Sequence, residues 1–316
     1  MPLLLADRRR LVAVTALSIA ALSIAALGLS ACSSSSASTP SDTATSATHV
    51  MEHAHGETSI PDAPKRVVVL EPVQLDTTVA LGITPVGAAV LNETAGVPAY
   101  LGEQAADIPT VGTVAEPNVQ LIAAAKPDLI IGTESRHSAL YDQLSEIAPT
   151  VFMATQTDPW RDNVQFVAEA LGDPDGADGL LDAYDARCGE IAKEHDTAGK
   201  TAQLIRPRDG VLTLYGPTSF AGSTLECAGF TTPEHAWEDI SLDLSPERVL
   251  EAKADQVFVT SVDPDDTSTL PASLTANTDA FPELHLVDQS FWITGVGPLG
   301  GMAVLDDLDR LLSDGS

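Results

Sequence analysis

The 316-residue chain has few aromatic side chains, few basic side chains and three cysteines. Lysine and arginine together number 16 against 45 aspartates and glutamates, which gives a formal net charge of −29. Nucleic acids and anionic membrane surfaces repel a protein this acidic. The composition therefore predicts no nucleic-acid partner, and most of the acidic residues are expected to serve solubility.

The motifs of several large enzyme classes are also missing. The chain contains no G-x-S-x-G elbow, no Walker loop, no H-E-x-x-H motif and no C-x-x-C pair. Residues 295–300 match G-x-G-x-x-G, but only 16 residues follow, too few for the remainder of a dinucleotide site. We interpret this segment as a glycine-rich turn and helix start. The sequence predicts a protein that is not an enzyme and has no cofactor of its own.

The first 31 residues have the pattern of an export signal. Arg8, Arg9 and Arg10 precede an uncharged run of 19 residues, and the run ends in LSAC, which resembles a lipoprotein cleavage box. Residues 1–31 are therefore predicted to be a signal peptide, and Cys32 the lipidated first residue of the mature protein. Both the general and the twin-arginine export routes fit the arginines. Cleavage removes three of the 16 basic residues and one of the 45 acidic ones, leaving a formal charge of −31.

Serine, threonine and alanine dominate the segment after Cys32. Such a composition buries too little apolar surface to fold, so residues 32–59 are predicted to be a tether. Three histidines and a glutamate within it could gather a metal ion, although we favour a polar lead-in to the first strand. These residues are His49, His53, His55 and Glu57. Cys188 and Cys227 remain, and the sequence leaves open whether they form a disulfide or two buried thiols.

Two segments about 127 residues apart read alike. Residues 120–133 (QLIAAAKPDLIIGT) and 247–260 (ERVLEAKADQVFVT) align without a gap, and Lys, Asp and Thr recur at the same places. Each predicts a helix, a tight turn and a buried parallel strand. A helix continuous from about Ala177 to Glu194 would span ~27 Å, long enough to join two lobes rigidly. We predict lobes at residues 60–158 and 198–316 with a helical connector at 159–197.

The order of several longer segments resembles one known family. The runs are RVVVL, LDTTVALGITPVG, IPTVGTVAEPNVQLIAAAKPDLIIGT, RHSALYDQLSEIAPTVF and FWITGVGPLGGMAVLDDL. Together they resemble the class III solute-binding lipoproteins of ABC importers, and among these the iron-siderophore group. The resemblance implies two Rossmann-like α/β lobes joined by one long helix, with ligand held between them. It also implies a monomer anchored outside the cell membrane that delivers a ferric siderophore, which carries the iron, to an ABC permease. Haem, a corrinoid or a bare transition-metal ion is the alternative ligand.

Candidate ligand-binding residues follow from the expected sheet edges. Ligands of open α/β sheets bind beyond the carboxyl ends of the strands. The loops expected there contain Glu71, Asn92, Tyr100, Arg136, His137, Tyr215, Phe220, Phe291 and Trp292. The rings can pack on the apolar body of a ligand, and Arg136 can donate hydrogen bonds to iron-bound oxygens. Because a chain at −31 repels a triply anionic catecholate complex, we expect a hydroxamate ligand.

Two further positions concern the permease. In the family that the sequence resembles, one glutamate on each lobe docks an arginine pocket of the permease. Glu247 matches this pattern, whereas the repeat places Gln120 at the equivalent position of the first lobe. An amide accepts a weaker hydrogen bond from arginine than a carboxylate does. Either Glu116 substitutes for the missing acid, or docking is asymmetric.

Overall fold

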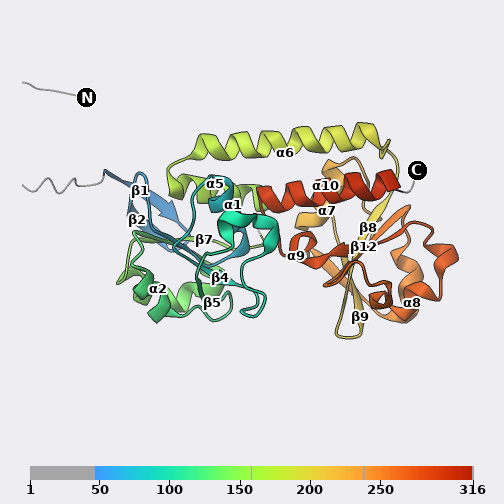
Figure 1. Ribbon diagram of the computed structural model, residues 1–316, viewed down its shortest axis with the longest axis horizontal. Helices are drawn as coiled ribbons and strands as arrows, with labels where there is room; N and C mark the ends of the chain where they lie inside the picture. Colours follow the sequence, from blue (N-terminus) through green and yellow to red (C-terminus); the bar gives the residue numbers. More distant parts are fainter. Residues whose placement is uncertain (1–46, 158, 238, 315–316) are drawn as a thin grey trace, which may run out of the picture. The chain divides into compact units, whose positions relative to one another are not determined.

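The computed structural model describes residues 47–157, 159–237 and 239–314. They form two α/β lobes, each built on a five-stranded sheet, and helix α6 (Pro174–Glu194) runs beside both (Figure 1). This confirms the predicted fold class. The predicted signal peptide and Cys32 lie outside the described residues. Among the described residues, no helix has the length and apolar character that crossing a membrane requires.

The sheet of the first lobe is parallel throughout, with the order β5-β4-β3-β6-β7. Its strands are β3 (Val67–Val69), β4 (Gly87–Val90), β5 (Thr110–Thr113), β6 (Leu129–Thr133) and β7 (Thr150–Met153). The β-branched run of β3 is buried on both faces, as expected for a central parallel strand. Helices α1 (Pro72–Ala80) and α5 (Trp160–Leu171) cover one face, and α2 (Val119–Ala125) and α4 (Tyr141–Ser145) cover the other.

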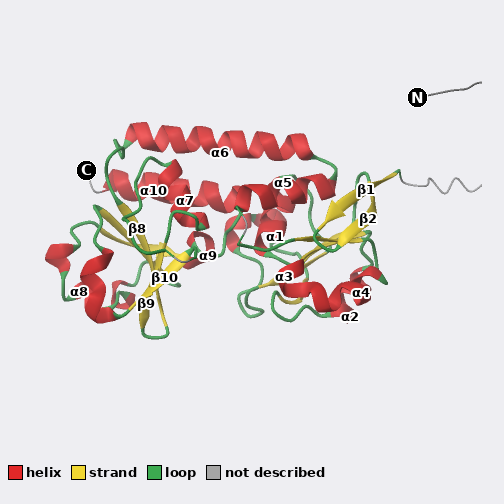
Figure 2. Ribbon diagram, turned by 180° about the vertical axis from the view of Figure 1, so that it is seen from behind, coloured by secondary structure: helices red, strands yellow, loops and turns green. Residues whose placement is uncertain are grey.

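The sheet of the second lobe is mixed, with the order β10-β9-β8-β11-β12. Strands β8, β9 and β10 of this sheet are labelled in Figure 2. Its strands are β8 (Ala202–Arg208), β9 (Val211–Tyr215), β10 (Ser241–Leu244), β11 (Gln256–Ser261) and β12 (Leu284–Asp288). Strands β8, β11 and β12 are parallel, whereas β9 runs antiparallel to both of its neighbours. Helices α7 (Phe220–Cys227), α9 (Gln289–Trp292) and α10 (Pro298–Asp314) pack on one face, and the 3-10 helix η4 (Pro246–Ala252) and α8 (Ala272–Thr275) on the other.

The repeated segments occupy equivalent places in the two lobes, and the shared aspartate has the same task in each. Asp128 accepts hydrogen bonds from the backbone N–H groups of Lys65 and Arg66, immediately before β3. Asp255 accepts one from the N–H of Thr201, immediately before β8. Each carboxylate thus fixes the start of the strand beside its own. The repeat is not exact, because the second segment forms a 3-10 helix where the first forms α2.

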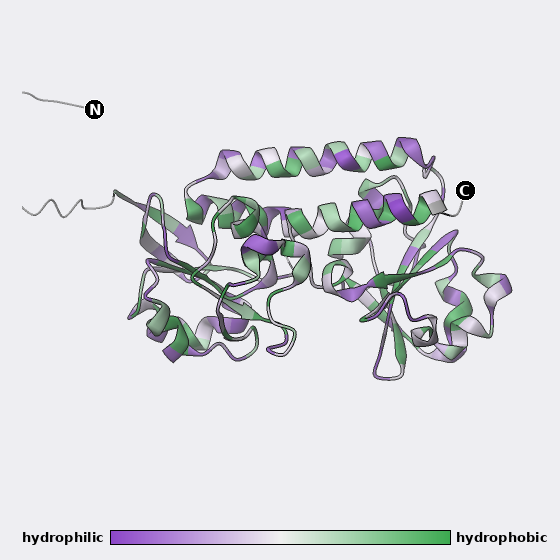
Figure 3. Cartoon of the chain, in the orientation of Figure 1, coloured by the Kyte–Doolittle hydropathy of each residue, from purple (hydrophilic) through white to green (hydrophobic). Residues whose placement is uncertain are grey.

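Helix α6 joins the lobes through a continuous apolar face. Asp173 caps its N-terminus by accepting a hydrogen bond from Gly176 N, and Pro174 occupies the first turn. Hydrophobic and hydrophilic residues alternate along it (Figure 3). Its buried residues belong to one core cluster with α5, α7 and α10. Cys188 on this helix forms a disulfide with Cys227 at the end of α7, with a Cα–Cα distance of 5.4 Å, which decides the question that the sequence left open.

A buried carboxylate connects the first lobe to the C-terminal helix. Asp76 on α1 is fully buried, and its two oxygens accept hydrogen bonds from Leu299 N at 2.9 Å and Gly300 N at 2.8 Å. Both donors belong to the first turn of α10, where an anion is favoured. Gly297 permits the approach, because a Cβ there would lie 2.4 Å from Cγ of Asp76. The glycine-rich run is therefore a turn and helix start, as predicted.

The predicted tether ends earlier than the sequence suggested. Residues 48–59 do not form part of a tether, because β1 (Thr48–His53) and β2 (Gly56–Pro61) form an antiparallel hairpin. Met51 and Ile60 are buried in the core of the first lobe, and Ala54 N donates a hydrogen bond to Phe152 O on β7. The hairpin therefore covers an edge strand. Strand pairing and the burial of Met51 and Ile60 together attach this polar segment to the first lobe.

The bond between Asp76 and α10 predicts a stability effect. Asp76→Asn keeps the shape of the side chain but loses one of two acceptors and directs an NH₂ group at a backbone N–H. We expect a loss of about 2 kcal/mol in the free energy of unfolding, measured by urea denaturation. Asp182→Asn, at an exposed position on α6, is the control. Equal stability of the two variants would show that Asp76 does not hold α10.

Candidate ligand-binding site

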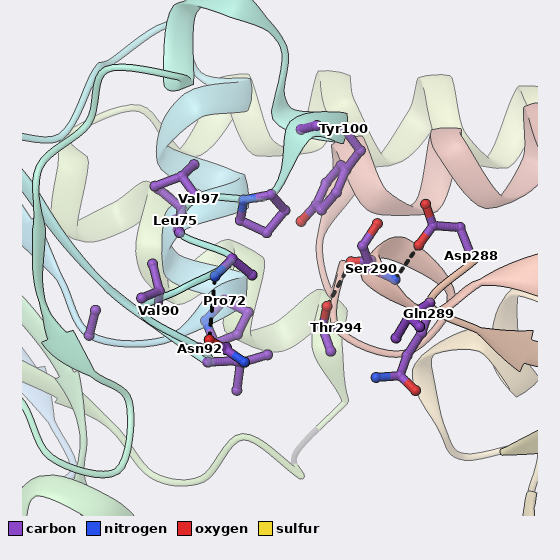
Figure 4. A pocket seen from close by; sticks show the side chains of 17 residues that line it. Pro72, Leu75, Val90, Asn92, Val97, Tyr100, Asp288, Gln289, Ser290 and Thr294 are labelled. Atoms are coloured by element: carbon purple, nitrogen blue, oxygen red, sulfur yellow. Dashed lines mark hydrogen bonds between the residues drawn. The ribbon is translucent and has the colours of Figure 1, made fainter. Parts of the chain in front are cut away.

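A cavity of about 440 Å³ lies between the two lobes at the edges where parallel strands end (Figure 4). The first lobe contributes the start of α1 and the loop after β4, and the second contributes the residues after β11 and β12. Its lining includes Leu75, Val90, Leu91, Val97, Val262, Asn92, Tyr100, Asp288, Gln289, Ser290 and Thr294. An apolar wall with few polar groups and this volume is typical of a small-molecule site.

The loop after β4 forms most of the wall on the side of the first lobe. Asn92 orders it by accepting hydrogen bonds on Oδ1 from Thr94 N at 2.8 Å and Ala95 N at 3.3 Å. Leu91 in the first lobe and Val262 in the second are 52% and 85% exposed at the cavity. Large apolar side chains exposed on both sides of a cavity indicate a binding surface for an apolar group.

Tyr100 connects this wall to the lobe interface. Its hydroxyl hydrogen-bonds to the Asp76 carboxylate, and burial is the main reason that the pKa of Tyr100 lies well above its ordinary value. Its ring meets that of Phe291 edge to face, with the centroids 6.5 Å apart. Two predicted residues therefore contact each other across the lobes, and one of them, Tyr100, lines the cavity. Burial also raises the pKa of Asp76 to about 7, although its hydrogen bonds oppose that shift.

Glu71 and Arg136 form an ion pair at the carboxyl edge of the first sheet. Arg136 Nε lies 2.8 Å from Glu71 Oε1, and the side chains are 40% and 3% exposed respectively. Burial raises the pKa of Glu71 to about 7, while Arg136 and a hydrogen bond from Thr133 act against the shift. The structure thus brings two predicted site residues together. The charge of Arg136, however, is compensated by a buried acid of the protein itself.

Two predicted contacts are wrong because their side chains belong to the core. Trp292 is fully buried, its ring stacks on Phe258 with the centroids 4.9 Å apart, and its Nε1 donates to Asp307. His137 is 1% exposed, and its ring nitrogens hydrogen-bond to Thr133 N and Val114 O. Neither ring lines the large cavity, although Trp292 borders a smaller space of about 90 Å³.

Tyr215 and Phe220 line a different and smaller cavity. Because β9 is antiparallel to β8, Tyr215 pairs with Leu204 in the middle of that strand. The expectation that the end of β9 borders the large cavity is therefore wrong. The two rings instead line a space of about 90 Å³ together with Trp160 and Ile293.

Several lining residues were missed by the sequence analysis. Leu91, Val262 and Gln289 each follow directly after a parallel strand and face the large cavity. Their positions directly after parallel strands are the signal that could have identified them, because ligands bind beyond the carboxyl ends of such strands. Ser290 and Thr294 belong to the same second-lobe segment, and the hydroxyl of Thr294 donates to Ser290 O at 2.7 Å.

The three histidines of the hairpin do not form a metal centre. His49 Nδ1 bonds to Asp62, His53 Nε2 to Thr58 Oγ1, and His55 Nδ1 to Glu134. Among the described residues, the ligand atoms gathered closely enough to hold an ion are those of Glu194, His195 and Asp309, and Arg187 already pairs with the last of these. The bare-metal alternative therefore gains no support from the hairpin.

The chain belongs to the periplasmic binding protein family, whose sequence model matches residues 67–283. This family consists of substrate-binding proteins.

The names of several similar proteins state the ligand that each of them binds. The chain is 34% identical over 291 residues to a probable siderophore-binding lipoprotein of Bacillus subtilis, YfiY, covering 85% of this chain and 89% of that protein. An Fe(3+)-citrate-binding protein of the same organism, YfmC, is 32% identical over 62% of this chain and 64% of its own length. Among solved structures, Staphylococcus aureus SirA complexed with staphyloferrin B has a TM-score of 0.72 at 29% identity, covering 84% of this chain and 98% of SirA.

The buried Glu71 predicts a pH dependence of stability. Its pKa is about 7 in the folded protein against an ordinary value of 4.5. Proton binding by Glu71 therefore stabilises the folded protein. This stabilisation is complete below about pH 4.5 and is lost as the pH rises through 7. We expect the free energy of unfolding of Glu71→Gln to fall less between pH 5 and pH 8 than that of the wild type. Part of the pH dependence of stability should remain in the variant, because the pKa of Asp76 is also about 7. The control is the exposed Glu103→Gln, and a slope unchanged by Glu71→Gln would contradict the assignment.

Proposed function

We propose that the protein is an extracytoplasmic receptor that captures a ferric siderophore and delivers it to an ABC importer for iron uptake. The observation that carries this proposal is the apolar cavity between the ends of the two sheets, in a chain whose similarity to a siderophore-binding lipoprotein spans both lobes. A ferric complex with an organic shell fits such a cavity better than a bare ion does. The protein's part is binding, and the iron comes with the ligand.

The charge of the protein supports a ligand of low negative charge. The formal charge of the full chain is −29, so a triply anionic chelate is repelled at long range. Arg136, the cation chosen from the sequence, is already paired with Glu71. A hydroxamate complex that is neutral or carries one charge remains our proposal for the ligand type.

Membrane attachment and permease docking complete the proposed role. Lipidation of Cys32 would hold the receptor outside the cell membrane, as the names of relatives that are lipoproteins suggest. Gln120 and Glu247 are both exposed at the starts of α2 and η4, one on each lobe. Their exposure leaves both side chains free to meet a permease.

Ligand binding can be tested directly by quenching of tryptophan fluorescence. We expect saturable one-to-one binding of a ferric siderophore, with ferrioxamine B bound more tightly than a ferric tris-catecholate. Haem and a corrinoid are included to test the alternative ligands. The control is desferrioxamine B, the same chelator without iron. Binding of haem alone would contradict the proposed function, and stronger binding of the tris-catecholate would contradict only the hydroxamate assignment.

Docking can be tested in reconstituted uptake. Glu247→Ala should remove most of the stimulated transport, because a carboxylate makes a charge-assisted bond, whereas Gln120→Ala should have a smaller effect. Gln120→Glu should strengthen docking, by about 1 kcal/mol. Siderophore affinity, measured in parallel, should be unchanged in all three variants. Equal and large losses in the two alanine variants would show that docking is symmetric.

A further inference from the structure

The large cavity between the lobes has one charged side chain in its wall, and that side chain is an acid. Asp288 is the last residue of β12 and directly precedes α9. Of the described residues that line the cavity, it is the only one with a charged side chain, and none of them is a lysine, arginine or histidine. A ligand in this cavity therefore meets one negative charge and no positive charge from the lining side chains.

Half of the hydrogen-bonding capacity of Asp288 is unused. Its Oδ1 accepts a hydrogen bond from Ser290 N at 2.7 Å, which is the N-cap bond of α9 (Figure 4). Among the described residues, Oδ2 of Asp288 has no hydrogen-bond partner, and the carboxylate is in no ion pair. The cap bond thus holds the carboxylate at the cavity wall, and its second oxygen can accept a hydrogen bond from a ligand.

Two lining hydroxyls have already committed their protons to the protein. Thr294 Oγ1 donates to Ser290 O at 2.7 Å, and Ser290 is the residue that Asp288 caps. The hydroxyl of Tyr100 is bonded to Asp76, and it must be the donor when that carboxylate is ionised. A hydroxyl has one proton, so neither group then has a donor left for a ligand, while both oxygens keep lone pairs. These side chains favour a ligand group that donates hydrogen bonds.

The wall formed by the loop after β4 differs in its hydrogen-bonding character. Asn92 Oδ1 accepts from Thr94 N and Ala95 N, which leaves its NH₂ group to donate. This amide can bind an oxygen atom of a chelate, whereas the Asp288 carboxylate can bind only a donor. The two walls therefore suit different groups of one ligand.

The charges around the cavity act in the same direction as Asp288. Glu71 and Arg136 neutralise each other, and Asp76, behind Tyr100, adds a negative charge above its pKa of about 7. The formal charge of the full chain is −29. A cationic group is therefore attracted at long range and is held at short range by a carboxylate.

We propose that Asp288 forms a seat for a protonated amine carried by the ferric chelate. This inference rests on the proposed function and adds the chemistry of a group outside the iron centre. An ammonium has three N–H donors, so it can donate to Asp288 Oδ2 and to a further oxygen at this wall. The arm that carries the amine lies along the apolar side chains of Leu91 and Val262. A neutral hydroxamate centre with one free amine has a single positive charge, which agrees with the proposed ligand type.

The test compares two chelates that differ only in the amine. Ferrioxamine B carries a free primary amine, and N-acetylferrioxamine B is the same chelate with that amine made neutral. Binding is measured by fluorescence quenching at about pH 8, where Asp76 is ionised and a primary amine is protonated. We expect acetylation to weaken binding to the wild type by about 5- to 20-fold.

Asp288→Asn removes the charge and keeps the cap, because asparagine also accepts the Ser290 N–H bond. In this variant acetylation should change the affinity by less than about twofold, since the amine no longer meets a carboxylate. The matched control is Asp266→Asn. Asp266 caps η5 (Thr267–Thr269) through the same type of bond, to Ser268 N at 2.9 Å, and is not among the lining residues. The full loss on acetylation should persist there.

The outcomes separate the seat from the proposed function. Equal binding of both chelates by the wild type, or a loss on acetylation that persists in Asp288→Asn, would overturn the seat and leave the proposed function standing. Cadaverine tests a free diamine without iron, and binding as tight as that of ferrioxamine B would overturn the assignment of the amine to a chelate. Failure of the wild type to bind either chelate or any other ferric siderophore would overturn the proposed function and this inference with it.

Discussion

A buried carboxylate of the first lobe is bonded to the start of the C-terminal helix, beside the ligand cavity. Asp76 lies on α1 of the first lobe and holds the first turn of α10, which packs on the second lobe, although the bonded residues are 223 and 224 positions apart. Burying an isolated carboxylate is expensive, and here two backbone N–H groups at a helix N-terminus and the Tyr100 hydroxyl offset that cost. Because Tyr100 also lines the large cavity, the wall of the ligand site is attached to the same contact that fixes the lobes.

Most of the fold could be predicted because its signals are local. The β-branched run of β3, the proline and aspartate at the start of α6 and the repeated Lys and Asp each determine structure within a few residues. Predictions failed where a distant contact decided the outcome. Met51 and Ile60 order the hairpin only by entering the core of the first lobe. The direction of β9 depends on its pairing with β8 and β10, which no local pattern in β9 reveals.

The candidate site was less predictable, because side-chain orientation is a tertiary property. Trp292 and Tyr100 both occur in loops near strand ends, but the ring of Trp292 turns into the core against Phe258 while that of Tyr100 lines the cavity. Arg136 was recognised as a cation at a strand end, yet its buried acid partner comes from a different strand end.

The internal repeat aligns Thr133 with Thr260, and the strand registers place Glu71 and Arg206 beside these two threonines. Glu71 pairs with Arg136, whereas Nε of Arg206 has no hydrogen-bond partner among the described residues. The surrounding protein is strongly acidic, so its long-range field disfavours anions, and a single cation acts only at short range where the dielectric is low. Leu91 of the first lobe and Val262 of the second lobe both face the large cavity, so a ligand held there meets apolar surface from both lobes.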